Sequence, residues 1–393
     1  MSIRIFFLAT MMFQATILSL AQLKNNFTVT AYFYGGPDKV DSLEVEKLTH
    51  IIFSFCHLTG NKLTVDNEKD SQSIRKLVAA KARNSSLKVL LSLGGWGGCK
   101  TCSDVFSTAE GRNEFSESVL ALCKTYGTDG IDLDWEYPAV EGYPGHAFKP
   151  EDKPNFTALV RELRKTMGDE YEISFAAGGF QQFLEEAIEW REVMVLVDRV
   201  NLMTYDLVNG NSTVTGHHTA LYGTPQQHES TDNAVQYLIK LGIPANKLVI
   251  GAAFYGRMWE NVSQTNNGLY QSGKFKKGVN YRNSVKELSP STGFKLYWDD
   301  VAKAPYGYNA SQKLFVTYDD KRSMALKTTY ALDQGLNGIM FWEITNDTSR
   351  QGLLHTIDAA RKKYEGKGIG EQGYMVYGMV YGMVTEFLSK RPT

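Results

Sequence analysis

Short apolar runs recur along the chain, each bounded by turn residues, and most are followed by a segment with helix-like spacing of apolar residues. We expect eight of these runs to be buried strands, at residues 28–34, 50–56, 88–93, 130–135, 172–177, 199–205, 248–254 and 338–342. The helical spacing covers 71–83, 114–126, 155–167, 231–241, 320–333 and 352–363. Eight strands that alternate with helices predict an α/β fold, a parallel sheet closed as a (β/α)8 TIM barrel. An open doubly wound sheet is the alternative, but no G-x-G-x-x-G motif follows the first run.

One connection is much longer than the others. Residues 256–318 separate the seventh run from the next helical segment, where a usual loop has a handful of residues. The segment contains many aromatic residues, among them Tyr270, Trp298 and Phe315, and a flexible loop would leave them exposed. We therefore expect a small α+β insertion domain between strand 7 and helix 7, beside the barrel mouth. The catalytic barrel would then comprise residues 22–255 and 319–365.

The two ends of the chain are expected to lie outside the barrel. Arg4 precedes an apolar run, and residues 19–21 fit a small-residue cleavage site, so residues 1–21 are interpreted as a signal peptide. This interpretation predicts a secreted protein, extracellular or periplasmic, without stable membrane insertion after the signal is removed; an uncleaved anchor is the alternative. Residues 366–393 are expected to form a C-terminal tail, which contains the near-repeat of residues 374–384.

Charge and cysteine content narrow the function classes. Lys and Arg number 42 against 43 Asp and Glu, and no basic run with interleaved aromatic residues occurs, so nucleic acid is not an expected partner. Cys99 and Cys102 supply only two of the roughly four ligands of a zinc site, and are expected to be a local disulfide or free thiols. The adjacent His217 and His218 do not by themselves make a metal site. We expect no metal, no cofactor and a monomeric chain.

The most informative residues are three acids within the fourth apolar run. Asp132, Asp134 and Glu136 are spaced by two, so on a strand their side chains share one face, while Ile131 and Leu133 take the other. The apolar face suits the helix side of a barrel, so the acids are expected to point inward. Buried carboxylates lose solvation and repel one another, which raises the pKa of one partner and keeps a proton in the row. A protonated carboxylic acid is what glycoside cleavage requires. A surface strand with solvated acids, or a divalent metal site, is the other interpretation.

These residues carry a family resemblance. Residues 129–138 resemble the D-G-x-D-x-D-W-E signature of glycoside hydrolase family 18, the chitinases and their relatives. Residues 92–96 resemble the family's S-x-G-G segment, and residues 203–206 its M-x-Y-D segment. Trp342 ends the eighth strand, where the family keeps a Trp beneath the cleaved sugar. The insertion resembles that of the deep-cleft chitinase subgroup.

The resemblance implies a retaining, substrate-assisted hydrolysis of chitin or chitooligosaccharides, the β-1,4-linked polymers and oligomers of N-acetylglucosamine. Glu136 would be the general acid and base, and the acetamide carbonyl of the substrate would be the nucleophile. Asp134 would turn between Asp132 and the acetamide N–H, Asp132 would share its proton, and Tyr205 would hold the acetamide oxygen.

Further residues match cleft positions by their places at strand ends. Aromatic residues offer flat faces to the apolar C–H faces of sugars. Core packing is the other interpretation for Phe55 and Met203, whereas the polar groups of Asp206 and Arg257 favour function. The residues expected to bind substrate are Trp342, Trp96, Tyr32, Phe55, Met203, Asp206, Tyr255 and Arg257.

Two other functions compete with a chitinase. A non-catalytic chitin-binding lectin is disfavoured because the acid row and Tyr205 are all present. An endo-β-N-acetylglucosaminidase acting on N-glycans would share the acid row, but such enzymes usually lack the insertion.

Overall fold

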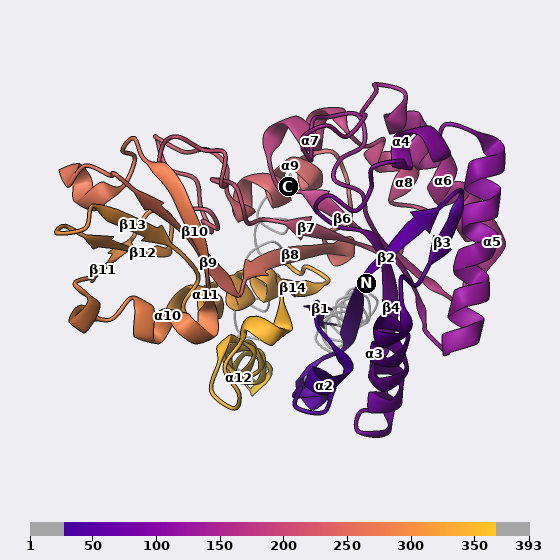
Figure 1. Cartoon of the computed structure of the whole chain (residues 1–393), viewed down its shortest axis with the longest axis horizontal. Helices are drawn as coiled ribbons and strands as arrows, with labels where there is room; N and C mark the ends of the chain where they lie inside the picture. The colour runs from indigo at the N-terminus through magenta and orange to yellow at the C-terminus, as the bar shows by residue number, and fades with distance from the viewer. Residues whose placement is uncertain (1–26, 367–393) are drawn as a thin grey trace, which may run out of the picture.

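The computed structural model describes residues 27–366, which form a closed parallel barrel with a second, antiparallel sheet beside it (Figure 1). The barrel order is β1-β14-β8-β7-β6-β5-β4-β2, and β2 pairs with β1 to close it. Each of the eight neighbouring pairs is parallel, so the predicted (β/α)8 barrel is confirmed. The barrel strands are β1 (Thr28–Phe33), β2 (His50–Thr59), β4 (Lys88–Gly94), β5 (Gly130–Asp134), β6 (Glu172–Gly178), β7 (Arg199–Met203), β8 (Leu248–Ala253) and β14 (Gly338–Trp342).

Helices cover the outside of the barrel (Figure 1). The long ones are α3 (Glu68–Ala79), α5 (Ala109–Tyr126), α6 (Asp152–Met167), α9 (Thr231–Lys240), α11 (Lys321–Asp333) and α12 (Leu353–Gly366). The short ones are α2 (Pro37–Val40), α4 (Cys102–Val105), α7 (Gln181–Glu186) and α8 (Trp190–Val193). The helices α7 and α8 were not expected from the sequence. Neither was the strand β3 (Lys62–Thr64), which pairs antiparallel with the C-terminal end of β2.

Local hydrogen bonds explain where several of these helices begin. The side chains of Asn67, Thr108 and Ser230 each accept a hydrogen bond from the backbone N–H three residues later, at the starts of α3, α5 and α9. Asp320 and Ser323 form a reciprocal capping box at the start of α11. These caps satisfy backbone donors that a helix leaves unpaired in its first turn.

Two apolar layers lie on the two faces of the barrel strands. The outer layer packs against the helices and includes Ile131, Leu133 and Trp135, as the alternation predicted. The inner layer fills the barrel interior and consists of Tyr32, Ile52, Leu90, Ala176, Met203, Tyr205, Val249, Ala253 and Met340. The acid row of β5 faces this inner layer, so its charge is removed from bulk water.

The long connection after β8 folds into the antiparallel sheet, of order β10-β9-β13-β12-β11. Its strands are β9 (Tyr255–Glu260), β10 (Lys274–Asn280), β11 (Lys295–Asp299), β12 (Ala304–Asn309) and β13 (Leu314–Thr317), with α10 (Tyr281–Glu287) after β10. Trp259 and Phe315 are fully buried in its core. The predicted α+β insertion is therefore confirmed, and the flexible loop is excluded.

Several sequence-based expectations fall on the ends of the chain. The signal peptide of residues 1–21 and the near-repeat of residues 374–384 lie outside the described residues, and both stay predictions. Among residues 27–366, no helix is both long and apolar enough to span a membrane. Cys99 and Cys102 form a disulfide, which was one of the two expected states, and Cys56 and Cys123 are buried free thiols.

Candidate active site

The acid row lies at the C-terminal end of β5, the end of a TIM barrel where active sites are found. Asp132 and Asp134 are buried within the strand, and Glu136 follows two residues later, half-buried at the mouth. Their spacing of two carries all three toward the interior of the barrel. The alternative of a surface strand with solvated acids is therefore excluded.

Asp132, the deepest acid, is surrounded by donors from four other strands of the barrel, β1, β4, β6 and β7. Its Oδ2 accepts hydrogen bonds from the hydroxyls of Tyr32 (2.9 Å) and Ser92 (3.2 Å). Its Oδ1 accepts from the Ser174 hydroxyl (2.6 Å) and the Asn201 amide (3.0 Å). Burial raises the pKa of Asp132, while these four hydrogen bonds favour its ionised form. The donors also hold the carboxyl group in one orientation.

Asp134 has a different environment. Its Oδ1 is buried and accepts no hydrogen bond from the described residues. Burial raises the pKa of Asp134 well above its usual range, and the nearby charges of Glu136 and Asp132 raise it further. The environment of Asp134 therefore favours its protonated form, and its Oδ1 is available to a polar partner.

Glu136 is poised to exchange a proton near neutrality. Burial raises the pKa of Glu136 to about 7, and the negative charge of Asp206 contributes to the shift. A group whose pKa lies near the working pH serves both as an acid and as a base. A pKa near 7 therefore suits Glu136 to donate a proton in one step and to accept a proton in a later step.

Two tyrosines lie at the ends of β7 and β8, two and three strands around the barrel from the acid row. Tyr205 follows β7, and its hydroxyl contacts Sδ of Met340 at 3.8 Å. Burial raises the pKa of Tyr205 well above its usual range, with further contributions from Tyr255 and Asp134, so its hydroxyl stays a hydrogen-bond donor. Tyr255 packs edge-to-face on Tyr205, with ring centroids 6.1 Å apart.

A charged cluster completes this side of the mouth. Arg257 of β9 makes a two-pronged ion pair with Asp206, and the ring of His218 lies 3.5 Å from the same carboxylate. Burial alone would raise the pKa of Asp206, but the hydrogen bonds that it accepts from Arg257, together with the nearby His218, hold that pKa well below its usual range. Because Arg257 belongs to the insertion sheet and Asp206 to the barrel, the pair joins the two units at the site.

Aromatic rings occupy the opposite arc of the mouth. Trp342 stacks on Phe55, with centroids 5.6 Å apart and planes at 14°, and its ring also lies 5.9 Å from Tyr32. Trp96, in the loop after β4, is 54% exposed and contacts the ring of Tyr137 at 6.5 Å. Since β14, β1, β2 and β4 are consecutive neighbours, these rings form a series around half of the rim.

Residues 28–347 match glycosyl hydrolases family 18. The chain belongs to this family. A curated family 18 relative is Chitinase A1 from Niallia circulans, 29% identical over 405 residues; the match covers 84% of this chain and 58% of that protein. The chain thus spans little more than half the length of Chitinase A1.

Solved family 18 structures share the fold. The chitinase ChiA74 from Bacillus thuringiensis superposes with a TM-score of 0.80 at 28% identity, covering 86% of this chain and 70% of the other. A family 18 N-acetylglucosaminidase from Paenibacillus barengoltzii superposes with a TM-score of 0.77 at 36% identity, covering 85% of this chain and all of the other.

In this family 18 chain, the structure brings the expected site residues together in two layers. Glu136, Tyr205, Tyr255 and the ion pair of Asp206 with Arg257 surround the mouth. Tyr32 is only 1% exposed, and it contacts Asp132 instead of the open cleft. The other residues are placed as follows: Met203 is buried in the inner layer, Phe55 and Trp342 are half-buried at the rim, and Trp96 is exposed.

Sequence reasoning missed part of the support beneath the acids. Ser174 and Asn201 were not singled out, although each is a polar residue within an apolar strand, which is the signal that could have found them. His218 was noted only as half of a histidine pair, and its contact with Asp206 depends on a fold that joins distant segments.

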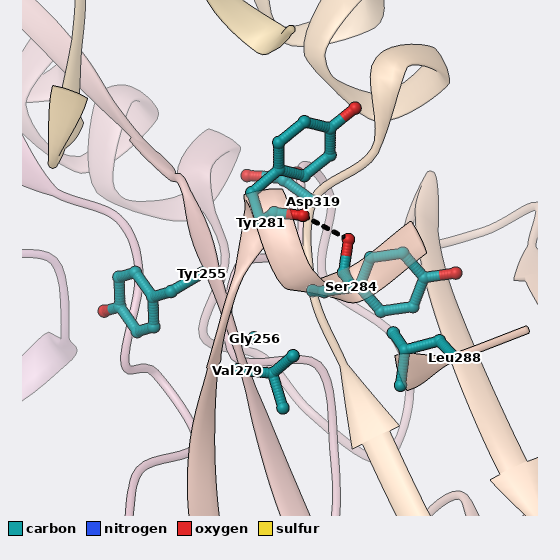
Figure 2. Close-up of a pocket in the computed structure, with 8 residues that line it drawn as sticks. Tyr255, Gly256, Val279, Tyr281, Ser284, Leu288 and Asp319 are labelled. Carbon is teal, nitrogen blue, oxygen red and sulfur yellow. Dashed lines mark hydrogen bonds between the residues drawn. The ribbon is translucent and has the colours of Figure 1, made fainter. Parts of the chain in front are cut away.

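A small hollow lies within the insertion, close to its junction with the barrel (Figure 2). Its lining includes Tyr255, Val279, Tyr281, Leu288 and Asp319. Only Tyr255 belongs to the expected substrate-binding residues, so this hollow is separate from the acid row. Residues 27–366 contain no group of three or more His, Cys, Asp or Glu side chains suited to a metal ion.

Proposed function

We propose that this family 18 chain is a chitinase that hydrolyses β-1,4-linked N-acetylglucosamine polymers and oligomers. The observation that carries the proposal is the pair of inward-facing acids at the mouth: Glu136, whose pKa burial raises to about 7, and the buried Asp134, whose pKa burial raises well above its usual range. The likeness to Chitinase A1 and to the chitinase ChiA74 supports the choice of substrate.

The proposed first step breaks the glycosidic bond. Glu136 donates its proton to the glycosidic oxygen, which leaves with the departing sugar. The acetamide carbonyl oxygen of the retained sugar forms a bond to its own anomeric carbon and gives a cyclic oxazolinium ion. Asp134 passes its proton to Asp132 and turns toward the acetamide N–H, whose hydrogen bond it accepts, and as a carboxylate it offsets the positive charge. Tyr205 donates its hydroxyl to the acetamide oxygen. The donors around Asp132 keep that deeper carboxyl in place while Asp134 turns.

The second step returns the proton. Glu136, now ionised, takes a proton from water, and the water oxygen attacks the anomeric carbon from the side that the leaving group vacated. The ring of the intermediate opens and restores the acetamide. Two inversions give a product with the anomeric configuration of the substrate, and the protonated Glu136 is ready for the next cycle.

Glu136→Gln tests the proposal because glutamine keeps the shape of the side chain and cannot donate a carboxylic proton. We expect kcat on chitin hexamers to fall by about 10²- to 10⁴-fold, the usual contribution of a general acid, while the variant still binds the oligosaccharide. Glu141→Gln, an exposed glutamate on the same loop, is the matched control and should turn over like the parent. Equal cleavage by the Glu136→Gln variant and the parent would remove Glu136 from the mechanism.

The anomeric ratio of the first products tests the chemistry separately. Nuclear magnetic resonance spectra recorded before mutarotation should show the β-anomer in excess. An initial excess of the α-anomer would contradict the retaining mechanism and leave the substrate assignment intact.

A second candidate is an N-acetylglucosaminidase that removes single sugars from a chain end. It is favoured by the Paenibacillus barengoltzii relative, all of whose length the chain covers at 36% identity. The product profile from chitin hexamers distinguishes the two: a chitinase releases oligomers, whereas the second candidate releases monomers. Release of a glycan from a high-mannose glycoprotein, with chitin oligomers left intact, would instead indicate an endo-β-N-acetylglucosaminidase.

We also propose that the chain is exported, on the basis of the signal-like residues 1–21. Mass spectrometry of the secreted protein should find Gln22 at its N-terminus.

A further inference from the structure

An aromatic corner lies at the rim of the mouth, outside the residues that the proposed mechanism uses. It is formed by Trp96, in the loop after β4, and Tyr143, in the loop after β5. Their ring centroids are 5.5 Å apart and their planes meet at 69°, so the two rings face different directions. Trp96 is 54% exposed and Tyr143 is 39% exposed. The two rings therefore offer solvent-accessible apolar faces beside the acid row.

The position of Tyr143 is set by the backbone of Glu136. The Tyr143 N–H donates to the carbonyl oxygen of Glu136 at 3.4 Å. The neighbouring Gly142 packs so closely that a Cβ there would lie 2.2 Å from the same oxygen. The His146 N–H donates in turn to the Tyr143 carbonyl at 3.0 Å. The loop thus folds back on the proposed acid, and Tyr143 keeps a fixed place relative to it.

The loop after β4 is shaped to receive the Tyr143 ring. Gly97 has a φ of +88°, which favours glycine, and a Cβ at this position would lie 3.0 Å from the ring. The disulfide between Cys99 and Cys102 closes the same loop. On the other side, the His146 ring lies 4.8 Å from the Tyr143 ring. Because the ring is already held, binding a ligand costs little further side-chain entropy.

The chemistry of the corner favours a neutral sugar. Aromatic faces bind the apolar C–H faces of pyranose rings, whereas no carboxylate or guanidinium contacts Tyr143 among the described residues. Burial, together with the nearby charge of Lys100, lowers the pKa of His146, so its ring is neutral at neutral pH. The corner also continues the aromatic series of the rim, on the side away from Trp342.

We infer that Tyr143, supported by His146, is an additional sugar-binding residue, which contacts an N-acetylglucosamine unit one position beyond the sugar at Trp96. The inference rests on the proposed function and extends it to chain length. An oligomer long enough to reach Tyr143 gains a contact that a short one lacks. Tyr143 thereby sets a preference for longer chains without taking part in the chemistry.

Binding measurements in the Glu136→Gln background test this inference, because hydrolysis is then suppressed. By isothermal titration calorimetry, adding Tyr143→Ala should weaken the binding of chitin hexamer by about 3- to 10-fold and leave chitin trimer unchanged. Tyr143→Phe keeps the flat ring and should bind both oligomers like the background. Tyr222→Ala is the matched control, since this tyrosine is 37% exposed and packs on Tyr330 of α11, away from the corner.

The outcomes distinguish a failure of the Tyr143 inference from a failure of the proposed function. Hexamer binding by a folded Tyr143→Ala variant that equals the background would overturn the inference and leave the proposed function standing. Failure of the background itself to bind any chitin oligomer would overturn the proposed function, and the inference with it. If alanine disturbs the loop, Tyr143→Leu keeps the bulk without the flat face and is expected to show the same selective loss.

Discussion

A buried ion pair beneath the insertion provides the sharpest test of the packing. Nζ of Lys327, in α11, lies 2.7 Å from Oδ2 of Asp319, in the link between β13 and α11, and neither side chain is exposed. Asp319 also accepts hydrogen bonds from the backbone N–H of Ala253 in β8, from Ser323, and from Thr219 in the segment after β7. The pair therefore links the end of the insertion sheet to β8 and to the segment after β7.

Lys327→Met removes the positive charge while keeping an unbranched apolar side chain. Asp319 is left as a buried carboxylate with hydrogen bonds but no counter-charge. Breaking a buried pair in this way costs about 3–5 kcal/mol of unfolding free energy. For the roughly 340 residues 27–366, the unfolding entropy at Tm is about 0.7 kcal/mol/K. The expected fall in Tm is therefore about 4–7 °C.

Thermal unfolding followed by circular dichroism at neutral pH and one scan rate measures this fall. Lys165→Met is the matched control, because Lys165 is 73% exposed and its pair with Glu162 should contribute less than about 1 kcal/mol. Adding Asp319→Asn to Lys327→Met removes the uncompensated charge and should recover part of the loss. A Lys327→Met variant that melts within about 1 °C of the parent would refute the assignment of this pair as a buried, mutually dependent ion pair.

Two further predictions concern pH. Because Glu136 acts first in its protonated form, activity should decline as the pH rises through about 7. Asp206→Asn removes a negative charge that raises the pKa of Glu136, so this limb of the pH–kcat/KM profile should move to lower pH. An unmoved limb would contradict this expectation. At the opposite end of the barrel, burial would raise the pKa of Glu172, but the hydrogen bond from His50 and the charge of Arg199 lower it to about 2 from an ordinary 4.5. The stability that Glu172 contributes is thus present above pH 4.5 and lost as the pH falls toward 2. The free energy of unfolding of Glu172→Gln, measured with urea, should therefore vary less with pH over this interval than that of the parent. Parallel pH dependences of the two proteins would show that the interactions of Glu172 with His50 and Arg199 do not contribute.

The acid row and its surroundings show how far sequence reasoning extends. The inward direction of Asp132 follows from a period of two and from the apolar residues between the acids. The identity of its partners does not, because it depends on register: β4 sets Ser92 beside Asp132, and β6 sets Ser174 there. Alternation predicts that such residues face inward, whereas the sequence of a single strand says nothing about which residue of a neighbouring strand lies at the same height.

The same limit explains the charged side of the mouth. Asp206 and Arg257 were each expected at the cleft, but their mutual ion pair joins residues 51 positions apart, across the boundary between barrel and insertion. The Tyr143 loop was not anticipated at all, since its place depends on contacts with the backbone of Glu136 and with Gly97.

The sequence by itself determined the (β/α)8 barrel, the insertion after the seventh barrel strand, and the row of acids on the inner face of β5, because hydrophobic periodicity and spacing are local properties of the chain. Only the tertiary structure decided that burial raises the pKa of Asp134 well above its usual range and that of Glu136 to about 7, and that Tyr32 donates a hydrogen bond to Asp132. Those properties arise from burial and from distances between charges, and both are established only when segments far apart in the chain pack together.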